Sequence, residues 1–163
     1  MSETILGRKL TCVVLVGGLV LAAIAALELP GNAMAADQDS AKTAIRKVLE
    51  DQAAAWNKGD LEGFMAGYLK SDELTFFSGG KVTKGWQATL DNYRKRYQGD
   101  GKEMGKLTFS DLDVSVLSTE NSIVRGHWKV EMSSKTPEGL FTLWFHKEKD
   151  GWRIVHDHTS AQE

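Results

Sequence analysis

The sequence predicts an α+β domain in which helices come first and an antiparallel sheet follows. In the first half of the chain, apolar residues recur every three or four positions, as they do on one face of a helix. After residue 105 the pattern changes to runs of alternating polarity separated by turn-forming residues, which is typical of consecutive strands. No repeat or linker interrupts this order, so we expect helices packed on one face of a curved sheet.

The first 35 residues have the features of an export signal. Arg8 and Lys9 precede an apolar run, residues 10–27, and Ala33-Met34-Ala35 is the small-x-small pattern that a signal peptidase accepts. We therefore predict a signal peptide over residues 1–35 and a periplasmic or secreted protein. The alternative is an uncleaved N-terminal membrane anchor, because the apolar run approaches the roughly 20 residues that cross a bilayer.

The remaining residues, 36–163, are expected to form one domain. The chain has 163 residues, of which 42% are hydrophobic and 26% charged, within the ordinary range of globular proteins. The single cysteine, Cys12, lies in the signal segment, so disulfides cannot stabilise the exported domain. The net charge of -2 includes no basic excess, which argues against nucleic acid or an anionic membrane surface as a partner.

Three helices are predicted ahead of the sheet. Ser40 is a suitable N-cap for the first, whose apolar stripe continues to Trp56. Asp60 can cap a second helix over residues 61–69, and a third is expected over residues 86–97.

Six strands are predicted after the second helix. The first two form a short hairpin at 74–83 around the sequence Ser-Gly-Gly. The four longer strands are expected at residues 106–118, 122–132, 140–149 and 152–160.

Two histidines near the end of the chain are the candidate catalytic residues. Asp150-Gly151 is a preferred pair for a two-residue hairpin loop, which would place His156 opposite Phe145. Because side chains alternate along a strand, His156 and His158 would then share an apolar face, with Asp157 on the other face. In the alternative, a three-residue loop, the two histidines lie beside Thr142, Trp144 and His146.

The same histidines could contribute to a metal site only with further ligands. Two strand residues at i and i+2 point the same way, and a catalytic zinc needs a third ligand, for which His127 is available. No histidine-glutamate helix motif is present and the exported domain has no cysteine. We therefore expect no metal and no other cofactor.

The aromatic residues predict a small-molecule pocket between the helices and the sheet. Tyr93 and Tyr97 would bring hydroxyl groups toward the histidines, and an apolar cavity with a few polar groups is the usual form of such a site. Most of these aromatic side chains would serve equally well as core. The predicted pocket-lining residues are Trp56, Phe76, Trp86, Tyr93, Tyr97, Trp128, Phe141, Phe145, His156, His158 and Ser160.

Several stretches together resemble the nuclear transport factor 2-like superfamily, in its domain of unknown function 4440 or SnoaL-like branch. They are "AAWNKGDLEGFMAGY", "GWQATLDNYRKRY", "MGKLTFSDLDV", "VRGHWKV", "GLFTLWFHK" and "GWRIVHDHTS", and the resemblance covers nearly all of residues 41–161. The closing "VHDHTS" is also similar to the end of the calcium/calmodulin-dependent kinase II association domain. The resemblance implies a cystatin-like cone, in which three N-terminal helices pack on a strongly curved antiparallel sheet around a pocket.

Three functions follow from the residues and the resemblance. The first is an exported protein that binds a small, partly apolar organic molecule. The second is an isomerase, cyclase or dehydratase-type enzyme in which His156 or His158 exchanges a proton with a bound carbonyl compound. The third is an oligomerisation module. Members of the superfamily commonly pair, and Trp144 on a strand's outer face would be an exposed aromatic, so we expect a homodimer.

Overall fold

The computed structural model describes residues 30–162 and confirms the α+β order of elements. Three helices lie before residue 98, and the four long strands follow them. The elements are α1 (Pro30–Trp56), α2 (Leu61–Met65), β1 (Thr75–Ser78), β2 (Lys81–Lys84), α3 (Trp86–Tyr97), β3 (Lys106–Val116), β4 (Asn121–Glu131), β5 (Glu138–Glu148) and β6 (Gly151–Thr159).

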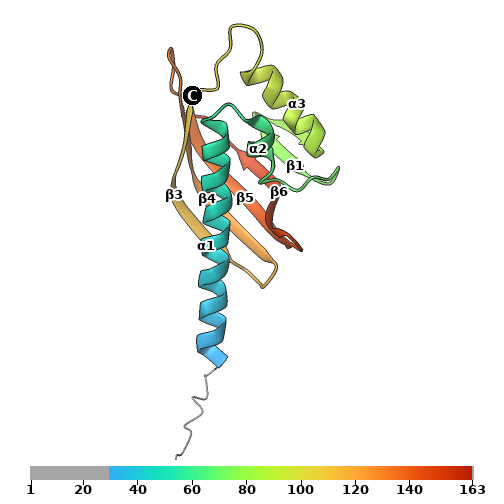
Figure 1. The fold of residues 1–163 in the computed structure, drawn as a ribbon, viewed down its shortest axis with the longest axis vertical. Helices are drawn as coiled ribbons and strands as arrows, with labels where there is room; N and C mark the ends of the chain where they lie inside the picture. Colours follow the sequence, from blue (N-terminus) through green and yellow to red (C-terminus); the bar gives the residue numbers. More distant parts are fainter. Residues whose placement is uncertain (1–29, 163) are drawn as a thin grey trace, which may run out of the picture.

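The strands form one curved sheet with the order β2-β1-β6-β5-β4-β3. Every neighbouring pair is antiparallel except β1 and β6, which run parallel. In Figure 1, α1 crosses the sheet along its length, while α2 and α3 lie at the end that carries β1. The helices and the concave face of the sheet enclose the core. Its most deeply buried apolar residues are Ile45, Leu49, Met65, Leu74, Leu90, Val124, Phe145 and Ile154.

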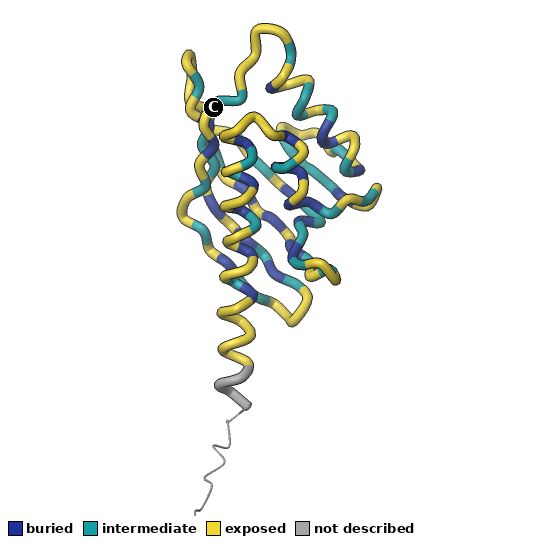
Figure 2. The backbone as a smooth tube through the Cα atoms, viewed as in Figure 1, coloured by how far each residue is buried: buried dark blue, intermediate teal, exposed yellow. Residues whose placement is uncertain are grey.

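Helix α1 is longer than the sequence predicts, because it starts at Pro30 and not after Ser40. Its buried stripe nevertheless begins at Ala41 and continues through Gln52 to Trp56, so the part that packs on the sheet matches the prediction. Residues 34–40 of α1 project beyond the sheet and are exposed (Figure 2). The predicted signal segment lies mostly outside the described residues. Within residues 30–162, no helix has the length and apolar character needed to cross a membrane.

Helix α2 is a short helix of five residues, and the chain that follows it places Tyr68 over the sheet. Asp60 caps it as predicted, accepting a hydrogen bond at 2.8 Å from the backbone N–H of Gly63. The helix ends at Met65, earlier than expected, because the backbone of Gly67 and Leu69 hydrogen-bonds to Ile154 of β6. Tyr68 therefore forms an isolated bridge to the sheet in place of a further helical turn.

Two β-bulges bend the sheet. In β3 the register shifts between Ser110 and Asp113, and Asp111 adopts a positive φ of 53°. In β6, Phe145 pairs with Ile154 and Trp144 pairs with His156, which leaves Val155 as the extra residue. A bulge adds one residue to one strand of a pair, so it bends the strand and changes which residues face inward.

Candidate functional site

The predicted hairpin register is wrong for the strand that carries the histidines. The two-residue turn is Lys149-Asp150, because Glu148 pairs with Gly151. The bulge at Val155 then changes the alternation, so that His156 lies opposite Trp144. This is the pairing that the alternative register assigned to His156.

His156 and His158 consequently lie on the outer face of the sheet and do not line the internal cavity. Nδ1 of His156 lies 2.6 Å from Oγ1 of Thr75 on the neighbouring strand. Both rings contact Phe77, with centroid distances of 4.8 Å and 6.0 Å. Partial burial, and then the charge of His158, lower the pKa of His156. The histidines form a surface cluster with Phe77 and cannot reach a ligand inside the cone.

The same bulge turns Asp157 inward, contrary to the prediction that it faces away from the pocket. Asp157 is only 3% exposed. Its carboxylate accepts a hydrogen bond from the Tyr68 hydroxyl at 2.8 Å and another from the Thr159 hydroxyl at 2.6 Å. Burial raises the pKa of Asp157 to about 6, although these two hydrogen bonds act in the opposite direction.

Tyr68, Asp157 and Thr159 all line a small cavity between the helices and the sheet, and we call this hydrogen-bonded group the polar end of the cavity. The cavity has a volume of about 70 Å³, enough for several water molecules or one compact organic group. Aromatic and aliphatic side chains make up most of its wall. The lining residues are Gln52, Trp56, Phe64, Tyr68, Tyr93, Tyr97, Leu107, Phe109, Trp128, Val130, Phe141, Leu143, Asp157 and Thr159.

Tyr93 connects the aromatic wall with the polar end of the cavity. Its ring makes edge-to-face contacts with Trp56 at 5.8 Å and with Phe64 at 5.3 Å. Burial, followed by the charge of Asp157, raises the pKa of both Tyr68 and Tyr93 well above the ordinary value. Both hydroxyls therefore stay protonated at neutral pH. The neighbouring carboxyl group of Asp157, with a pKa of about 6, titrates close to neutral pH.

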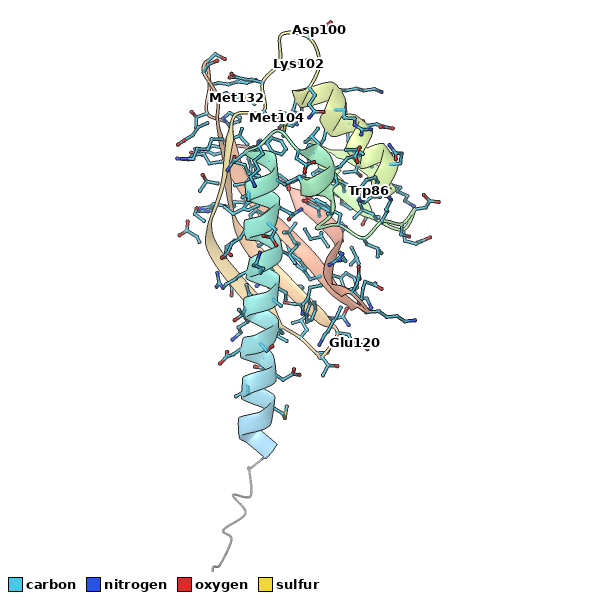
Figure 3. All side chains as sticks on the ribbon, in the orientation of Figure 1. Trp86, Asp100, Lys102, Met104, Glu120 and Met132 are labelled. Atoms are coloured by element: carbon cyan, nitrogen blue, oxygen red, sulfur yellow. The ribbon has the colours of Figure 1, made fainter. Side chains whose placement is uncertain are left out.

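A long loop between α3 and β3 contacts Trp56 in the cavity wall. The loop turns around Asp100 and returns through Met104 to β3, as Figure 3 shows. The indole N–H of Trp56 donates a hydrogen bond at 3.1 Å to the backbone carbonyl of Met104. This contact fixes the ring that forms one wall of the site.

Five of the predicted pocket residues line this cavity: Trp56, Tyr93, Tyr97, Trp128 and Phe141. The others lie elsewhere. Phe145 is fully buried in the core and Ser160 is exposed, its carbonyl accepting a hydrogen bond from Trp128. Trp86 stands at the start of α3 (Figure 3), where its indole N–H donates to the carbonyl of Met65. Phe76 packs on Tyr93 and borders an adjoining groove.

The polar residues of the site were missed by the sequence analysis. Tyr68 was assigned to a helix and Asp157 to the outer face, because both assignments assumed regular geometry. A tyrosine just after a capped helix and an acidic residue in an apolar strand are the signals present in the sequence. Neither signal marks the bulge that brings the two groups together.

Residues 45–162 match the SnoaL-like domain family over most of the chain. The chain belongs to this family. No curated protein matches it. Placement of this SnoaL-like protein in the domain of unknown function 4440 branch stays a prediction.

Solved structures agree with that membership. An NTF-2-like protein of unknown function from Shewanella oneidensis is 37% identical, with 73% of this chain and 98% of that chain covered and a TM-score of 0.69. A domain of unknown function with a cystatin-like fold from Nostoc punctiforme is 20% identical, with coverages of 76% and 78% and a TM-score of 0.64. The predicted cystatin-like fold is therefore confirmed.

A third similar structure is named as an enzyme. It is a putative scytalone dehydratase from Novosphingobium aromaticivorans, 13% identical, with coverages of 80% and 89% and a TM-score of 0.64. At this identity the similarity concerns the fold, which many unrelated activities share.

The SnoaL-like domain does not bring the three histidines considered for a metal site together. His127 lies on β4, where its Nδ1 is 3.0 Å from the carboxylate of Asp111, whereas His156 and His158 lie beside β1 and β5. Among residues 30–162, no group of three or more histidine, cysteine or acidic side chains is close enough to hold a metal ion.

Proposed function

We propose that this SnoaL-like protein binds a small, partly apolar organic molecule whose polar group contacts Asp157. One observation carries the proposal: a buried carboxyl group and the two hydroxyl groups that donate to it lie in the wall of a mostly apolar cavity. A carboxyl group is costly to bury, so its position inside an apolar wall needs a compensating role. An apolar cavity with a few convergent polar groups has the usual form of a small-molecule site.

The polar end can accept a further hydrogen bond. The carboxylate of Asp157 already accepts one from Tyr68 and one from Thr159. Two carboxylate oxygens together offer about four lone-pair directions, so acceptor capacity remains for a ligand hydroxyl or amide N–H. The expected ligand is an aromatic or aliphatic molecule with a hydrogen-bond donor at its inner end.

A pair of probes that differ only at this group tests the proposal. We expect p-cresol to bind about tenfold more tightly than p-xylene at neutral pH, because its hydroxyl can donate to Asp157. Titration calorimetry measures both dissociation constants. The preference should disappear in Asp157→Leu and persist in the control His158→Leu, which changes an exposed residue of the same strand.

Circular dichroism confirms that each variant is folded, and Thr159→Val serves as a second variant at the polar end. It should reduce the preference without removing the carboxylate. Equal binding of the two probes to the wild-type protein, or binding of neither, would contradict the proposal.

A second function, acid–base catalysis, is favoured by the titration of Asp157. A carboxyl group with a pKa of about 6 can both take up and release a proton near neutral pH. In such a step, the Asp157 carboxylate removes a proton from the carbon beside a bound carbonyl, leaving an enolate, and later returns that proton. The protonated hydroxyl of Tyr93 is available to donate a hydrogen bond to the enolate oxygen. Asp157 thus replaces the histidines as the candidate residue.

Exchange of protons for deuterium in phenylacetone tests this second function. If Asp157 transfers protons, the α-protons should exchange in deuterated water at least about tenfold faster with the protein than without it. Proton nuclear magnetic resonance follows the loss of signal. The rate should fall to the background in Asp157→Asn and stay unchanged in His158→Leu; no acceleration by the wild-type protein would leave binding as the sole function.

We also propose that the protein acts outside the cytoplasm, as a homodimer. Export is supported by the apolar run and the Ala-x-Ala pattern before residue 36. Pairing is supported by Trp144, which is 49% exposed on the outer face of β5.

A further inference from the structure

A second hollow adjoins the cavity and shares part of its wall. This hollow, the mouth groove, has a volume of about 570 Å³ and lies between α3, the β1-β2 hairpin and the end of the chain. Tyr93, Tyr97 and Trp128 line both the mouth groove and the cavity. A molecule that enters the cavity from this side would pass through the groove.

The sizes of the two spaces support a ligand that extends across both. The cavity alone, at about 70 Å³, is far smaller than a typical organic ligand site of roughly 300–1,000 Å³. The mouth groove supplies the missing volume. A ligand whose inner end reaches Asp157 would therefore have its outer end beside the groove residues.

The charged residues that line the mouth groove, among those that the structure describes, are all basic. Its lining includes two cationic residues, Lys81 and Arg96, and no acidic residue among the described residues. This bias is local, because acidic residues slightly outnumber basic ones in the chain as a whole. Hydroxyl and amide groups complete the polar part of the lining, from Ser78, Thr83, Thr89, Asn92 and Gln162.

Arg96 is held over the aromatic wall and has no carboxylate partner within the described part of the chain. Its guanidinium lies 5.3 Å from the centre of the Tyr97 ring, a cation–π contact. The nearby Arg94 differs, because it pairs with Glu62 at 2.6 Å and with Asp91 at 3.7 Å. The positive charge of Arg96 also lowers the pKa of Tyr93 and Tyr97, opposing burial, so its field reaches the cavity wall.

From this arrangement we propose that the mouth groove selects organic anions. The ligand class is an amphipathic carboxylate or sulfonate whose apolar body extends from the aromatic cavity into the mouth groove, while its anionic group lies near Arg96 and Lys81. An anion placed there contacts the mouth groove, whose lining does not include Asp157. The inference rests on the proposed binding function and adds the charge of the ligand to it.

Two dyes that differ only by an anionic group test the proposal. Anilinonaphthalene sulfonate and phenylnaphthylamine share the same aromatic body, and only the first carries a sulfonate. We expect the sulfonate to bind at least about fivefold more tightly at low ionic strength. Raising the salt concentration should reduce this preference, because the groove cations are exposed and screened.

Variants assign the preference to the groove. Arg96→Gln and Lys81→Gln should each lower the sulfonate affinity about two- to fivefold, with little effect on phenylnaphthylamine. Arg94→Gln is the matched control, because it removes the same charge from the same helix outside the groove. Val130→Phe, which fills the cavity, should weaken both dyes, and this reports whether the dyes occupy the site at all.

The outcomes separate the two proposals. If both dyes bind and Val130→Phe weakens them, but the sulfonate has no advantage or Arg96→Gln acts no differently from Arg94→Gln, the anion inference is wrong and the pocket function stands. If Arg96→Gln weakens both dyes equally, its role is structural and the inference is again wrong. If neither dye responds to Val130→Phe, the inference is wrong together with binding at this cavity.

Discussion

The hydroxyl of Tyr68 donates a hydrogen bond at 2.8 Å to the carboxylate of Asp157, 89 residues away in the sequence. Tyr68 reaches this position because the chain leaves α2 early and bridges to β6. Asp157 reaches it because the bulge at Val155 exchanges the faces of the sheet to which the following side chains of β6 point. The pair links the helical layer to the sheet and determines the polarity of the cavity.

Removing the Tyr68 hydroxyl should both destabilise the fold and raise the pKa of Asp157. Tyr68→Phe leaves one oxygen of a buried carboxyl group without its donor, which costs about 1–3 kcal/mol of unfolding free energy. Since that hydrogen bond stabilises the carboxylate, the pKa of Asp157 should rise above about 6. Urea unfolding and carbon nuclear magnetic resonance of the labelled carboxyl group measure the two effects.

Tyr97→Phe is the control for this variant. It removes a hydroxyl from the same cavity wall, and within residues 34–162 that hydroxyl forms no hydrogen bond with Asp157. An equal effect of both substitutions on Asp157 would show that the Tyr68 contact has no special role.

Asp157 should make the protein less stable as pH rises toward neutral. Burial raises its pKa in the folded state from the ordinary 3.8 to about 6, so the folded protein holds this proton more tightly than the unfolded chain. The stabilisation is fully present below about pH 4 and is lost progressively as pH rises through the folded pKa. Each pKa unit corresponds to about 1.36 kcal/mol, so the shift from 3.8 to about 6 gives a total loss of about 3 kcal/mol.

Comparison with Asp157→Asn isolates this contribution from other titrating groups. The difference in unfolding free energy between wild type and variant should fall by a few kcal/mol between about pH 4 and pH 7, with most of the change between the unfolded pKa of 3.8 and the folded pKa of about 6. Urea unfolding at a series of pH values measures it. A difference that stays constant over this range would mean that the pKa of Asp157 is not raised.

The sequence predicted the layers of the fold well, because they depend on periodicity. The stripe ending at Trp56, the cap at Asp60 and the helix over residues 86–97 all match the structure. The strand positions agree to within about two residues. Hydrophobic spacing is a local property, so one chain suffices to read it.

The candidate site was predicted only in its aromatic part. Trp56, Tyr93 and Tyr97 follow from helix periodicity, which holds in the structure. The polar end depends on a single extra residue, Val155, and one residue is enough to exchange the two faces of a strand. Bulges arise from the fit of a strand to its neighbours on both sides, β1 and β5, and this fit is not visible in the local sequence.

Export should shorten the chain to a form that begins at or near Ala36. The positions that a signal peptidase reads, at Ala33 and Ala35, carry small residues after an apolar run. Intact-mass measurement of the protein recovered from the periplasm or medium gives the new N-terminus. Ala35→Arg should block the cleavage. Recovery of the full-length chain in the membrane fraction from wild-type cells would support the anchor instead.

The outer face of the sheet should form the contact between two copies of the chain. Trp144 on β5 and Leu140 on the same strand are 49% and 55% exposed, and an exposed apolar patch is a mark of a protein–protein contact. The indole N–H of Trp144 donates at 3.0 Å to the side chain of Asn121, which holds the ring in a fixed orientation.

Light scattering at micromolar concentration should give twice the mass of one chain. Trp144→Glu should weaken the dimer at least about tenfold, because it places a charge in an apolar contact. Leu117→Glu is the control, since Leu117 is 61% exposed but lies in the turn between β3 and β4. A monomeric wild-type mass, or equal weakening by both variants, would show that this face of the sheet is not the interface.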